Sequence, residues 1–586
     1  MKRTLFGVVT AALLLSPAAV MSAGSASDLG SPSGEGATNL LDVKYDPEIE
    51  AAMQISKQDI LANRVRKAGA MGFVPGGAYD GIWLSDSTFV LEAYRYWGSE
   101  YRDFLYSDAP GRLGLVPRFA AVQDTDGQIP MALWGNEGRV EYGGRLDLAQ
   151  NRKEHRDMES PYTFVHVNYM YWKDTGDLTY VRRYRDSLRR ALEPIDRRRD
   201  AKTGLILGTY GPPNSDVCVD YAIPQTTAEP YFNALYVRAY LEYADVVEAL
   251  GDVAEARVCR MKASALREAI NRHLWIPARN RYETLILRTP VSSDPTLPAS
   301  RIQEDTRFPV VDNMLLIYYG IPDSREKIEA LIAQIEETEK GLAVVGRMVT
   351  PIYPDGFLTR NPLFDKGNYH NGDVWTWFSN RYAIALYQWG FPEKAGRVLE
   401  AQARVAIRDS GFSEYYEDDE IGAHKGAFHY GPTAATFQLA VVEGLFGLEL
   451  DAPRRVLRVR PSLSRSGSLR VRLGGGPADL RLDMRPERNE IQIRWDADFR
   501  GQGEFRVLVP DGFSKRGQWT VTQPMPKRNR RLSCVVSSSG SGTYVEFKPA
   551  LAPGAQEFVL KQAGARQLTG AQPGRAVPAL RKSSQT

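Results

Sequence analysis

The strongest constraint on the fold is a glycine that recurs along the first 450 residues at intervals of roughly 70 residues. The glycine usually follows an aromatic residue or a leucine, and it comes just before residues that favour helix starts, namely Pro, Asp, Ser or Glu. A glycine in this position is typical of a helix that ends in the left-handed conformation. The copies are Gly98, Gly176, Gly251, Gly320 and Gly390, with a weaker one at Gly447.

The sequence around these glycines has helical periodicity. In the stretch 231–250, apolar side chains fall on one helical face, at Phe232, Leu235, Tyr236, Ala239, Tyr240 and Tyr243. Each stretch of about 70 residues between two of these glycines therefore predicts a pair of helices joined by a long loop. Six such pairs account for residues 50–450. Their natural closed packing is a ring of inner helices surrounded by outer ones, with the loops at one end forming a site. A helical solenoid is the alternative, but its repeats are shorter, roughly 34 to 47 residues.

The sequence pattern changes after Arg454. Segments such as "SLRVRLGG", "EIQIRW" and "TYVEFKP" alternate apolar and polar residues between turn residues, which predicts an antiparallel β-sandwich. The last segment, 564–586, is rich in Gly, Pro, Ala, Gln and Ser, which predicts disorder. The predicted order is a signal peptide (1–26), an N-terminal segment (27–69), a helical domain (70–450), a β-sandwich (451–563) and a disordered basic tail (564–586).

The N-terminus indicates export. Lys2 and Arg3 precede an apolar run, Leu5 to Leu15, that is too short to span a bilayer, and small residues follow up to Ala26. An N-terminal anchor helix is disfavoured by the short run and by Pro17. We therefore expect a periplasmic or secreted protein without membrane insertion after cleavage.

Cysteine content and charge limit the remaining possibilities. Three widely spaced cysteines form neither a disulfide framework nor a zinc pattern, although one bridge is possible. The net charge of +3 divides unevenly, because residues 451–586 hold 25 Lys and Arg against 11 Asp and Glu. That basic part would either attract an anionic polymer or form a solvated strand face.

The long loops contain acids beside aromatic rings. The loop "DKGNYHNGDVWTW", starting at Asp365, is the densest case, and the others contain Tyr79, Asp80, Asp124, Asp126, Asp157, Glu159, Asp216, Asp220, Glu229, Glu414 and Glu417. Acids are rarely buried without partners, so an aromatic core layer alone does not explain the recurrence. Rings that stack on sugar faces, beside groups that bind hydroxyls, predict a carbohydrate site. Cleavage of a glycosidic bond needs two carboxyls, and the loops supply many.

The order of these loops resembles the six-hairpin glycosidase superfamily, the (α/α)6 toroids, which includes glycogen-debranching glucosidases, trehalases and related phosphorylases. "YHNGDVWTW" is similar to its Tyr-His-Asn-Gly-x-x-Trp-x-Trp loop, and "AEPYFNALYVRAY" resembles its Val-Glu-x-Asn-Ala-Leu-x-Tyr helix. "SEYYEDDEIG" resembles its Glu-Asn-Tyr-Asp-Pro-x-x-Gly segment, and "TAATFQLAVVEGLFGLELD" its closing helix. The likeness covers roughly residues 70 to 450. It implies a mainly α fold, an (α/α)6 toroid followed by the predicted sandwich, and a glycoside hydrolase.

The resemblance also assigns roles to residues. Its Thr-Trp-Met-Asp motif falls on "PNSD" and implies that Asp216 is the general acid, while the Glu of Glu-Asn-Tyr-Asp-Pro falls on Glu414 and implies the general base. Its Trp-x-Arg-Asp loop falls on "WLSD", which implies sugar contacts for Trp83 and Asp86. The remaining implied sugar contacts are Glu229, His370, Trp375 and Trp377.

This chain departs from the pattern around three of these residues. Glu229 lies two positions further from Asn233 than the Glu of the pattern lies from its Asn. Asn214 and Ser215 replace the Trp-Met before Asp216. Ser85 replaces the Arg before Asp86, and the lost fork of donors suggests that the sugar bound there is not plain glucose.

Each assignment has a structural alternative. Asp216 could cap a turn, and Asp220 is its rival as the acid. Glu414 could belong to a solvated acidic rim, and Asp86 could be a helix N-cap. His370 could be a hydrogen-bonded core histidine. The scattered histidines show no metal-ligand spacing, so we expect neither metal nor cofactor.

The sequence thus predicts an exported, inverting glycoside hydrolase with no nucleic-acid partner. A closed pocket is the commoner design of the superfamily that it resembles, which implies exo action on an oligosaccharide or polysaccharide. A phosphorylase of the same fold is one rival, with "HYGPTAATF" as its phosphate loop. A catalytically inactive polysaccharide-binding protein is the other.

Overall fold

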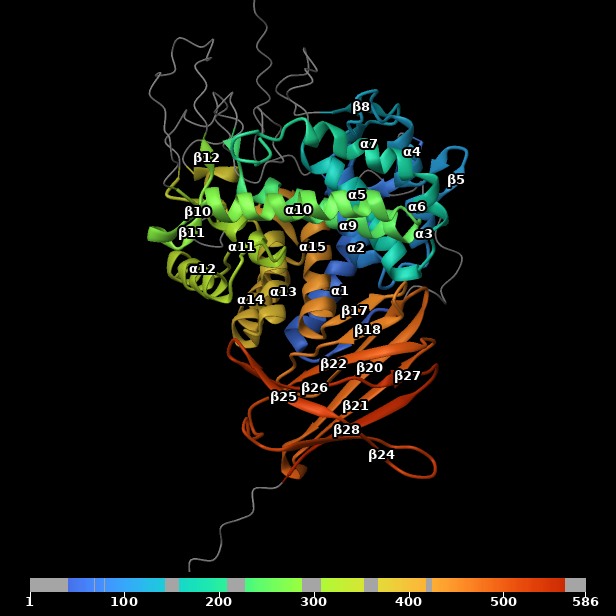
Figure 1. The fold of residues 1–586 in the computed structure, drawn as a ribbon, viewed down its shortest axis with the longest axis vertical. Helices are drawn as coiled ribbons and strands as arrows, with labels where there is room; N and C mark the ends of the chain where they lie inside the picture. Colours follow the sequence, from blue (N-terminus) through green and yellow to red (C-terminus); the bar gives the residue numbers. More distant parts are fainter. Residues whose placement is uncertain are drawn as a thin grey trace, which may run out of the picture.

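The computed structural model describes residues 40–67, 69–77, 79–142, 157–207, 227–286, 307–352, 367–417 and 424–563. The predicted signal peptide and the predicted basic tail lie outside these ranges. Within them, helices dominate up to residue 445 and strands dominate afterwards (Figure 1). The predicted mainly helical part followed by a strand-rich C-terminal region is confirmed.

One set of helices, here called the inner helices, is buried on nearly all sides. Every residue of α2 and α15 is buried, as expected for helices that other helices surround. Consecutive inner helices contact one another, and α15 contacts α2, so the path of contacts returns to its start. The set consists of α2 (Leu84–Tyr94), α5 (Glu159–Thr175), α9 (Pro230–Ala249), α11 (Val310–Tyr318), α13 (Thr376–Trp389) and α15 (Gly431–Leu439), which the π-helical η6 (Ala440–Leu445) continues.

The other helices bury one face only. In α14 (Pro392–Asp409) the buried positions include Ala395, Val398, Leu399 and Ala406, a helical spacing that leaves the charged face in solvent. These helices cover the inner set from outside, for example α10 on α9 and α14 on α13. They are α1 (Pro47–Ala62), α3 (Tyr101–Tyr106), α4 (Leu115–Ala121), α6 (Thr179–Arg183), α7 (Arg185–Asp196), α10 (Val253–His273), α12 (Arg325–Thr338) and α14.

The recurring glycines mark the C-terminal ends of the six inner helices. Five of them have positive φ, from 62° at Gly447 to 96° at Gly251, as the sequence predicts. The prediction is wrong for Gly98, which is not among the positive-φ glycines of the described residues. There a Cβ would lie 2.1 Å from the ring of Tyr94, so close packing requires the glycine.

Short strands lead into the inner helices at the opposite end. They form the sheets β4-β7-β8, β2-β3-β6-β5, β9-β12, β13-β14 and β15-β16, beside the separate hairpin β10-β11. Their bounds are β2 (Arg64–Lys67), β3 (Ala70–Phe73), β4 (Gly81–Trp83), β5 (Asp108–Ala109), β6 (Arg112–Leu113), β7 (Ala132–Trp134), β8 (Arg139–Glu141), β9 (Thr227–Ala228), β10 (Trp275–Ile276), β11 (Arg281–Tyr282), β12 (Leu285–Ile286), β13 (Phe308–Pro309), β14 (Val349–Thr350), β15 (Ser413–Tyr416) and β16 (His424–Phe428). Because β4, β9, β13 and β16 each come just before an inner helix, they fix the side chains at its N-terminus.

The strand-rich part contains two sheets, in the orders β1-β19-β20-β21-β28-β23-β24 and β17-β18-β22-β26-β25, with β27 beside β22. Phe558 of one sheet contacts Phe505 and Phe547 of the other, with ring centroids 5.2 and 5.6 Å apart. The strands are β1 (Asp42–Lys44), β17 (Leu448–Asp451), β18 (Val456–Val459), β19 (Gly467–Leu473), β20 (Gly476–Arg485), β21 (Glu490–Ala497), β22 (Gly501–Leu508), β23 (Trp519–Gln523), β24 (Arg530–Leu532), β25 (Cys534–Ser539), β26 (Gly542–Phe547), β27 (Ala550–Leu551) and β28 (Gln556–Gln562).

Two features of these sheets differ from the sequence prediction. The pair β18–β22 is parallel, because the intervening strands β19 to β21 belong to the other sheet and provide the crossover. The edge strand β1 comes from the N-terminal segment and pairs with β19, although the sequence predicts a separate segment there.

Backbone amides of the strand-rich part cap the inner helices. Four inner helices end with carbonyl oxygens that accept hydrogen bonds from strand or loop N–H groups, which satisfies acceptors left open at a helix end. The bonds are Arg472 N–H to Tyr96 O, Ala452 N–H to Lys173 O at 2.8 Å, Gly542 N–H to Gly390 O at 3.0 Å and Ser462 N–H to Leu445 O at 2.8 Å. The two parts therefore share an interface at the glycine-terminated ends.

Candidate active site

Glu414 is a buried carboxyl at the N-terminal end of the inner helices. It lies in β15, and its side chain is 3% exposed. Its Oε1 accepts a hydrogen bond from the Tyr79 hydroxyl at 2.8 Å, and its Oε2 accepts one from the Ala427 N–H at 2.8 Å. Burial raises the pKa of Glu414 to about 7, although both donors favour the charged form. Glu414 is therefore not part of a solvated acidic rim, which was the alternative considered from the sequence.

Asp86 lies beside Glu414. The negative charge of Asp86 contributes to the raised pKa of Glu414, and burial raises the pKa of Asp86 itself. Its carboxylate accepts hydrogen bonds from the Tyr430 hydroxyl at 2.7 Å and from the Ser85 hydroxyl at 3.2 Å. Asp86 is not the N-cap of α2, since Trp83 occupies that position and Asp86 falls in the first turn.

Aromatic rings surround these two acids. The ring of Trp375 stacks on Tyr415, with centroids 5.1 Å apart, and the ring of His370 lies 4.5 Å from Trp375. The ring of Trp83 lies 6.0 Å from Tyr79, the residue that holds Glu414. The buried indole N–H groups of Trp83 and Trp375 have no hydrogen-bond partner within the described residues, so they remain available as donors.

Trp377 lies apart from this aromatic group. Its ring contacts Phe378 at 3.5 Å and Phe89 of α2 at 5.0 Å. The sequence pattern groups Trp375 and Trp377 because they are two residues apart. Trp375 precedes α13, however, whereas Trp377 is already helical and turns towards α2.

Further acids lie at the N-termini of α5, α9 and α11. Tyr231 links two of them, because its hydroxyl donates to Glu159 at 2.8 Å and its backbone N–H donates to Asp312 at 3.3 Å. Burial raises the pKa of Asp312 to about 8, and burial together with the neighbouring Asp157 raises the pKa of Glu159 well above its usual value. Glu229, the N-cap residue of α9, is also buried.

Sequence reasoning missed Asp312 as a site residue. The signal in the sequence was an acid within the otherwise apolar run "FPVVDNMLLIYY". A carboxyl in such a run is expected to be buried, and a buried carboxyl requires a hydrogen-bonding or charged partner. The predicted acid Asp216 and its rival Asp220 lie in 208–226, outside the described residues. In the described ranges no group of His, Cys, Asp and Glu has an arrangement that could hold a metal ion.

A family model shows the enzyme class of the chain. The model of the mannosylglycerate hydrolase MGH1-like glycoside hydrolase domain matches residues 78–433, which is more than half of the chain. The chain belongs to this family. The expectation of a six-hairpin glycosidase and of a glycoside hydrolase is therefore confirmed. The matched range contains every residue that the sequence assigned to the site.

Solved structures of glycosidases are similar to this chain. An α-L-rhamnosidase from Dictyoglumus thermophilum matches with 10% identity and a TM-score of 0.55 over 89% of this chain and 50% of that chain. The rhamnosidase of Streptomyces avermitilis in complex with L-rhamnose matches with 12% identity and a TM-score of 0.53 over 89% and 42%. The GH63 mannosylglycerate hydrolase from Thermus thermophilus in complex with glucose matches with 19% identity and a TM-score of 0.48 over 66% and 99%.

The likeness to the two rhamnosidases shows the fold, and this chain spans half or less of the length of those two chains. No curated protein sequence matches this chain. Among the helices of the described residues, none has both the length and the apolar character needed to span a bilayer.

Proposed function

We propose that this chain is an exported, inverting glycoside hydrolase that removes sugars from the end of an oligosaccharide or polysaccharide. Glu414 would be the general base and Asp216 the general acid. The observation that carries the proposal is the buried Glu414 carboxyl, held by two donors beside Asp86. Membership of a glycoside hydrolase family supplies the reaction class.

The environment of Glu414 suits a base that activates water. A pKa of about 7 makes its carboxylate a stronger proton acceptor near neutral pH than an exposed glutamate. The Tyr79 hydroxyl fixes one oxygen, which leaves the carboxylate oriented for a water molecule. In single-step inversion the base removes a proton from that water while the water attacks the anomeric carbon.

The neighbouring side chains suit a sugar. Asp86 would accept hydrogen bonds from sugar hydroxyls while Tyr430 holds it, and the indole N–H groups of Trp83 and Trp375 would donate to sugar oxygens. Their rings, with His370, would cover the apolar faces of the sugar. Glu229 would contact the sugar from the start of α9, and Trp377 would support the wall from α13 rather than stack directly.

The acid must protonate the leaving oxygen from the opposite side. In the sequence, Asp216 precedes β9, and β9 leads into the N-terminus of α9. Inversion requires the two carboxyls to be roughly 6.5–9.5 Å apart, with room for the water. Asp220 is the rival for this role in the same segment.

The finer architecture is part of the proposal. The inner and outer helices would form the (α/α)6 toroid over 70–450, and the two large sheets would pack as a β-sandwich over 451–563 with β1 at one edge. Residues 1–26 would be a cleaved signal peptide. Mass spectrometry of the N-terminus of the exported protein tests the cleavage, and an intact Met1 would exclude it.

Proton NMR of the first product tests the mechanism. The substrate panel should contain aryl glycosides, oligosaccharides and mannosylglycerate, the compound named by the matching family. We expect the product with inverted anomeric configuration, and net retention would contradict the roles given to the two carboxyls. A requirement for phosphate would favour the phosphorylase, although a carboxyl at the base position argues against it.

Two variants separate the roles of the carboxyls. Glu414→Gln should lower kcat by roughly 10²–10⁴-fold on every substrate, because the base acts on water whatever the leaving group. Asp216→Asn should impair oligosaccharides far more than aryl glycosides, whose good leaving groups need little protonation. If Asp220→Asn shows this selective loss instead, Asp220 is the acid. Binding without turnover in the unmutated chain would indicate the polysaccharide-binding alternative.

A further inference from the structure

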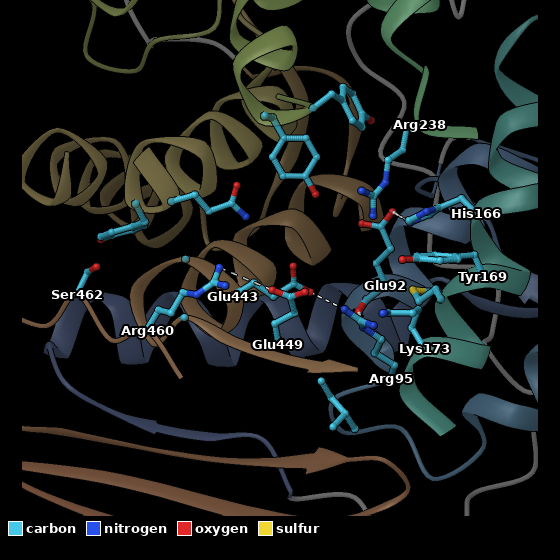
Figure 2. A pocket seen from close by; sticks show the side chains of 18 of the residues that line it. Glu92, Arg95, His166, Tyr169, Lys173, Arg238, Glu443, Glu449, Arg460 and Ser462 are labelled. Carbon is cyan, nitrogen blue, oxygen red and sulfur yellow. Dashed lines mark hydrogen bonds and ion pairs between the residues drawn. The ribbon is translucent and has the colours of Figure 1, made fainter. Parts of the chain in front are cut away.

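A cavity lies at the end of the inner helices opposite to Glu414, where their C-termini meet the strand-rich part (Figure 2). Its volume is about 280 Å³. Its wall includes Arg238, Tyr318 and Tyr387 from the inner helices, and Arg460, Arg506 and Tyr544 from the strand-rich part. Nothing in the proposed hydrolysis uses this cavity, because Glu414 lies at the opposite end.

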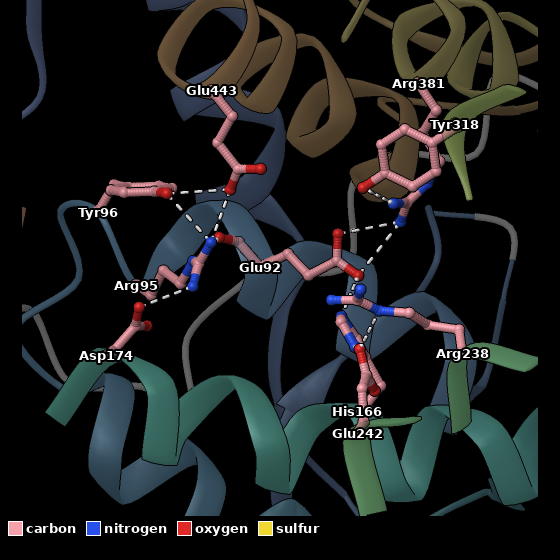
Figure 3. Close-up of polar contacts among 10 residues, drawn as sticks. All are labelled: Glu92, Arg95, Tyr96, His166, Asp174, Arg238, Glu242, Tyr318, Arg381 and Glu443. Carbon is pink, nitrogen blue, oxygen red and sulfur yellow. Dashed lines mark hydrogen bonds and ion pairs between the residues drawn. The ribbon is translucent and has the colours of Figure 1, made fainter. Parts of the chain in front are cut away.

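The helix-borne charges around the cavity neutralise one another (Figure 3). His166 lies between two carboxylates, with Nε2 3.1 Å from Glu92 and Nδ1 2.9 Å from Glu242. Burial alone would lower the pKa of His166, but the two carboxylates outweigh it and raise the pKa to about 9, so the ring is charged at neutral pH. The other pairs are Arg238 with Glu242, Arg381 with Glu92, and Arg95 with Asp174 and Glu443. These cations need no ligand.

The strand-borne cations are less well paired. Arg460 has its nearest carboxylate, Glu449, at 3.8 Å, and Glu449 already makes a 2.6 Å ion pair with Arg458. Arg506 is 3.6 Å from Glu546, and its Nη1 donates a 3.4 Å hydrogen bond to the Gln388 carbonyl oxygen. Charge-assisted hydrogen bonds are typically about 2.7–2.9 Å long, so both guanidinium groups keep donors free for another anion.

Tyr544 adds a hydroxyl donor at the same place. The Arg506 guanidinium lies 3.8 Å from the centre of the Tyr544 ring, which fixes the two side chains relative to each other. Tyr544 is 1% exposed, and its hydroxyl interacts with the side chain of Ser462, which also lines the cavity. Because a hydroxyl both donates and accepts, the Tyr544 hydroxyl can contact a ligand oxygen while it keeps the contact with Ser462.

The remaining wall defines the class of ligand. Two planar guanidinium groups match the two oxygens of a carboxylate. Glu443 and Glu449 also line the cavity, where they would accept hydrogen bonds from hydroxyl groups but repel a doubly charged phosphate. The cavity is slightly below the range of about 300–1,000 Å³ for drug-sized ligands, which suits a single sugar unit.

We propose that this cavity is a second ligand site, which binds a monoanionic sugar acid with its carboxylate on Arg460 and Arg506 and near the Tyr544 hydroxyl. The ligand's hydroxyl groups contact Glu443, Glu449 and the tyrosine-lined wall. The site joins the inner helices to the strand-rich part, so its occupation strengthens the contact between them. The proposal does not depend on the identity of the catalytic carboxyls.

Isothermal titration calorimetry on the full chain tests the site. The probes are D-glucuronate and D-gluconate, with D-glucose as the neutral match and inorganic phosphate as the other anion. We expect saturable binding of a sugar acid, no comparable binding of glucose, and unchanged affinity in Glu414→Gln. Equal affinity for glucose, tighter binding of phosphate, or no binding of either acid would overturn the proposal.

Variants locate the binding. Tyr544→Phe removes one hydroxyl and keeps the ring under Arg506, and Arg460→Gln removes one cation; each should weaken sugar-acid binding at least tenfold. Arg470→Gln is the matched control, because Arg470 is an exposed strand arginine that is hydrogen-bonded to Asp479 and lies in the sheet that contains β19 and β20, away from the cavity. The affinity of this variant for the sugar acid should not change. Wild-type affinity in both Tyr544→Phe and Arg460→Gln would show that the acid binds elsewhere.

Discussion

The buried base should destabilise the folded protein at alkaline pH. Folding raises the pKa of Glu414 from its usual value of 4.5 to about 7. Below pH 4.5 the carboxyl is protonated in both states and the contribution to stability is fully present. As the pH rises through 7 that contribution is lost, because the unfolded chain releases its proton more readily. A difference in pKa of this size corresponds to about 3 kcal/mol of unfolding free energy.

The variant Glu414→Gln removes the titration and keeps the shape of the side chain. Relative to the unmutated chain, it should gain stability steadily between about pH 4.5 and pH 8, by up to about 3 kcal/mol. Urea unfolding, followed by tryptophan fluorescence at several pH values, measures this difference. Each protein serves as the reference for the other, so pH effects shared by both cancel.

The control removes a carboxylate from the same segment. Glu417 follows β15 directly, but its side chain is 41% exposed and forms an ion pair with Lys425. A comparable gain with pH in Glu417→Gln would show that the effect does not come from the buried carboxyl of Glu414. If the stability difference for Glu414→Gln does not change with pH, or falls as pH rises, the description of Glu414 as a desolvated carboxyl is wrong.

Three further outcomes follow from the structure. In the profile of kcat/KM against pH, the acidic limb should lie near the pKa of Glu414. Tyr79→Phe should move this limb to higher pH, because the Tyr79 hydroxyl stabilises the charged carboxylate and the variant lacks that hydroxyl. An unmoved limb would exclude the role of Tyr79. His166→Gln should lower the unfolding free energy by about 3–5 kcal/mol at neutral pH in urea titrations, because two buried carboxylates lose their shared cation. The unmutated chain should lose this contribution as the pH rises through about 9, the pKa of His166, and equal stability of both proteins at neutral pH would contradict it. Gly390→Ala should lower the melting temperature more than Gly320→Ala, because both glycines have positive φ but only at Gly390 would a Cβ lie 2.1 Å from a backbone oxygen, that of Ser539. Equal losses would show that the contact between Gly390 and Ser539 can shift to make room for the methyl group.

Local patterns predicted much of the helical part. The glycines mark the ends of all six inner helices because the end of a helix is set by a few neighbouring residues. Glu414 and Asp86 were predicted as site residues because their motifs are short and continuous, and the structure brings these two acids together. The family comparison bears out the superfamily that those motifs indicated.

Long-range contacts escaped the sequence reasoning. The pairing of Val43 with Leu469 joins segments at opposite ends of the chain, and no local pattern reports it. The direction of Trp377 depends on where α13 begins, which the two-residue spacing does not reveal. The hydrogen bonds of Tyr231 to Glu159 and Asp312 likewise depend on how three helices meet, although each residue was visible in the sequence.

During synthesis, the inner helices are made before the residues that cap their C-terminal ends. The amides that satisfy the carbonyl groups of Lys173 and Gly390 belong to Ala452 and Gly542, so the ribosome makes the α-helices of the described residues before it makes these caps. Strand β1 leaves the exit tunnel first and waits for β19, its partner in the sheet. A nascent chain halted near residue 450 would contain Glu414 and Asp86 but would lack the amides that cap these helices. Its unsatisfied carbonyl groups would be exposed to chaperones or neighbouring chains until translation is complete.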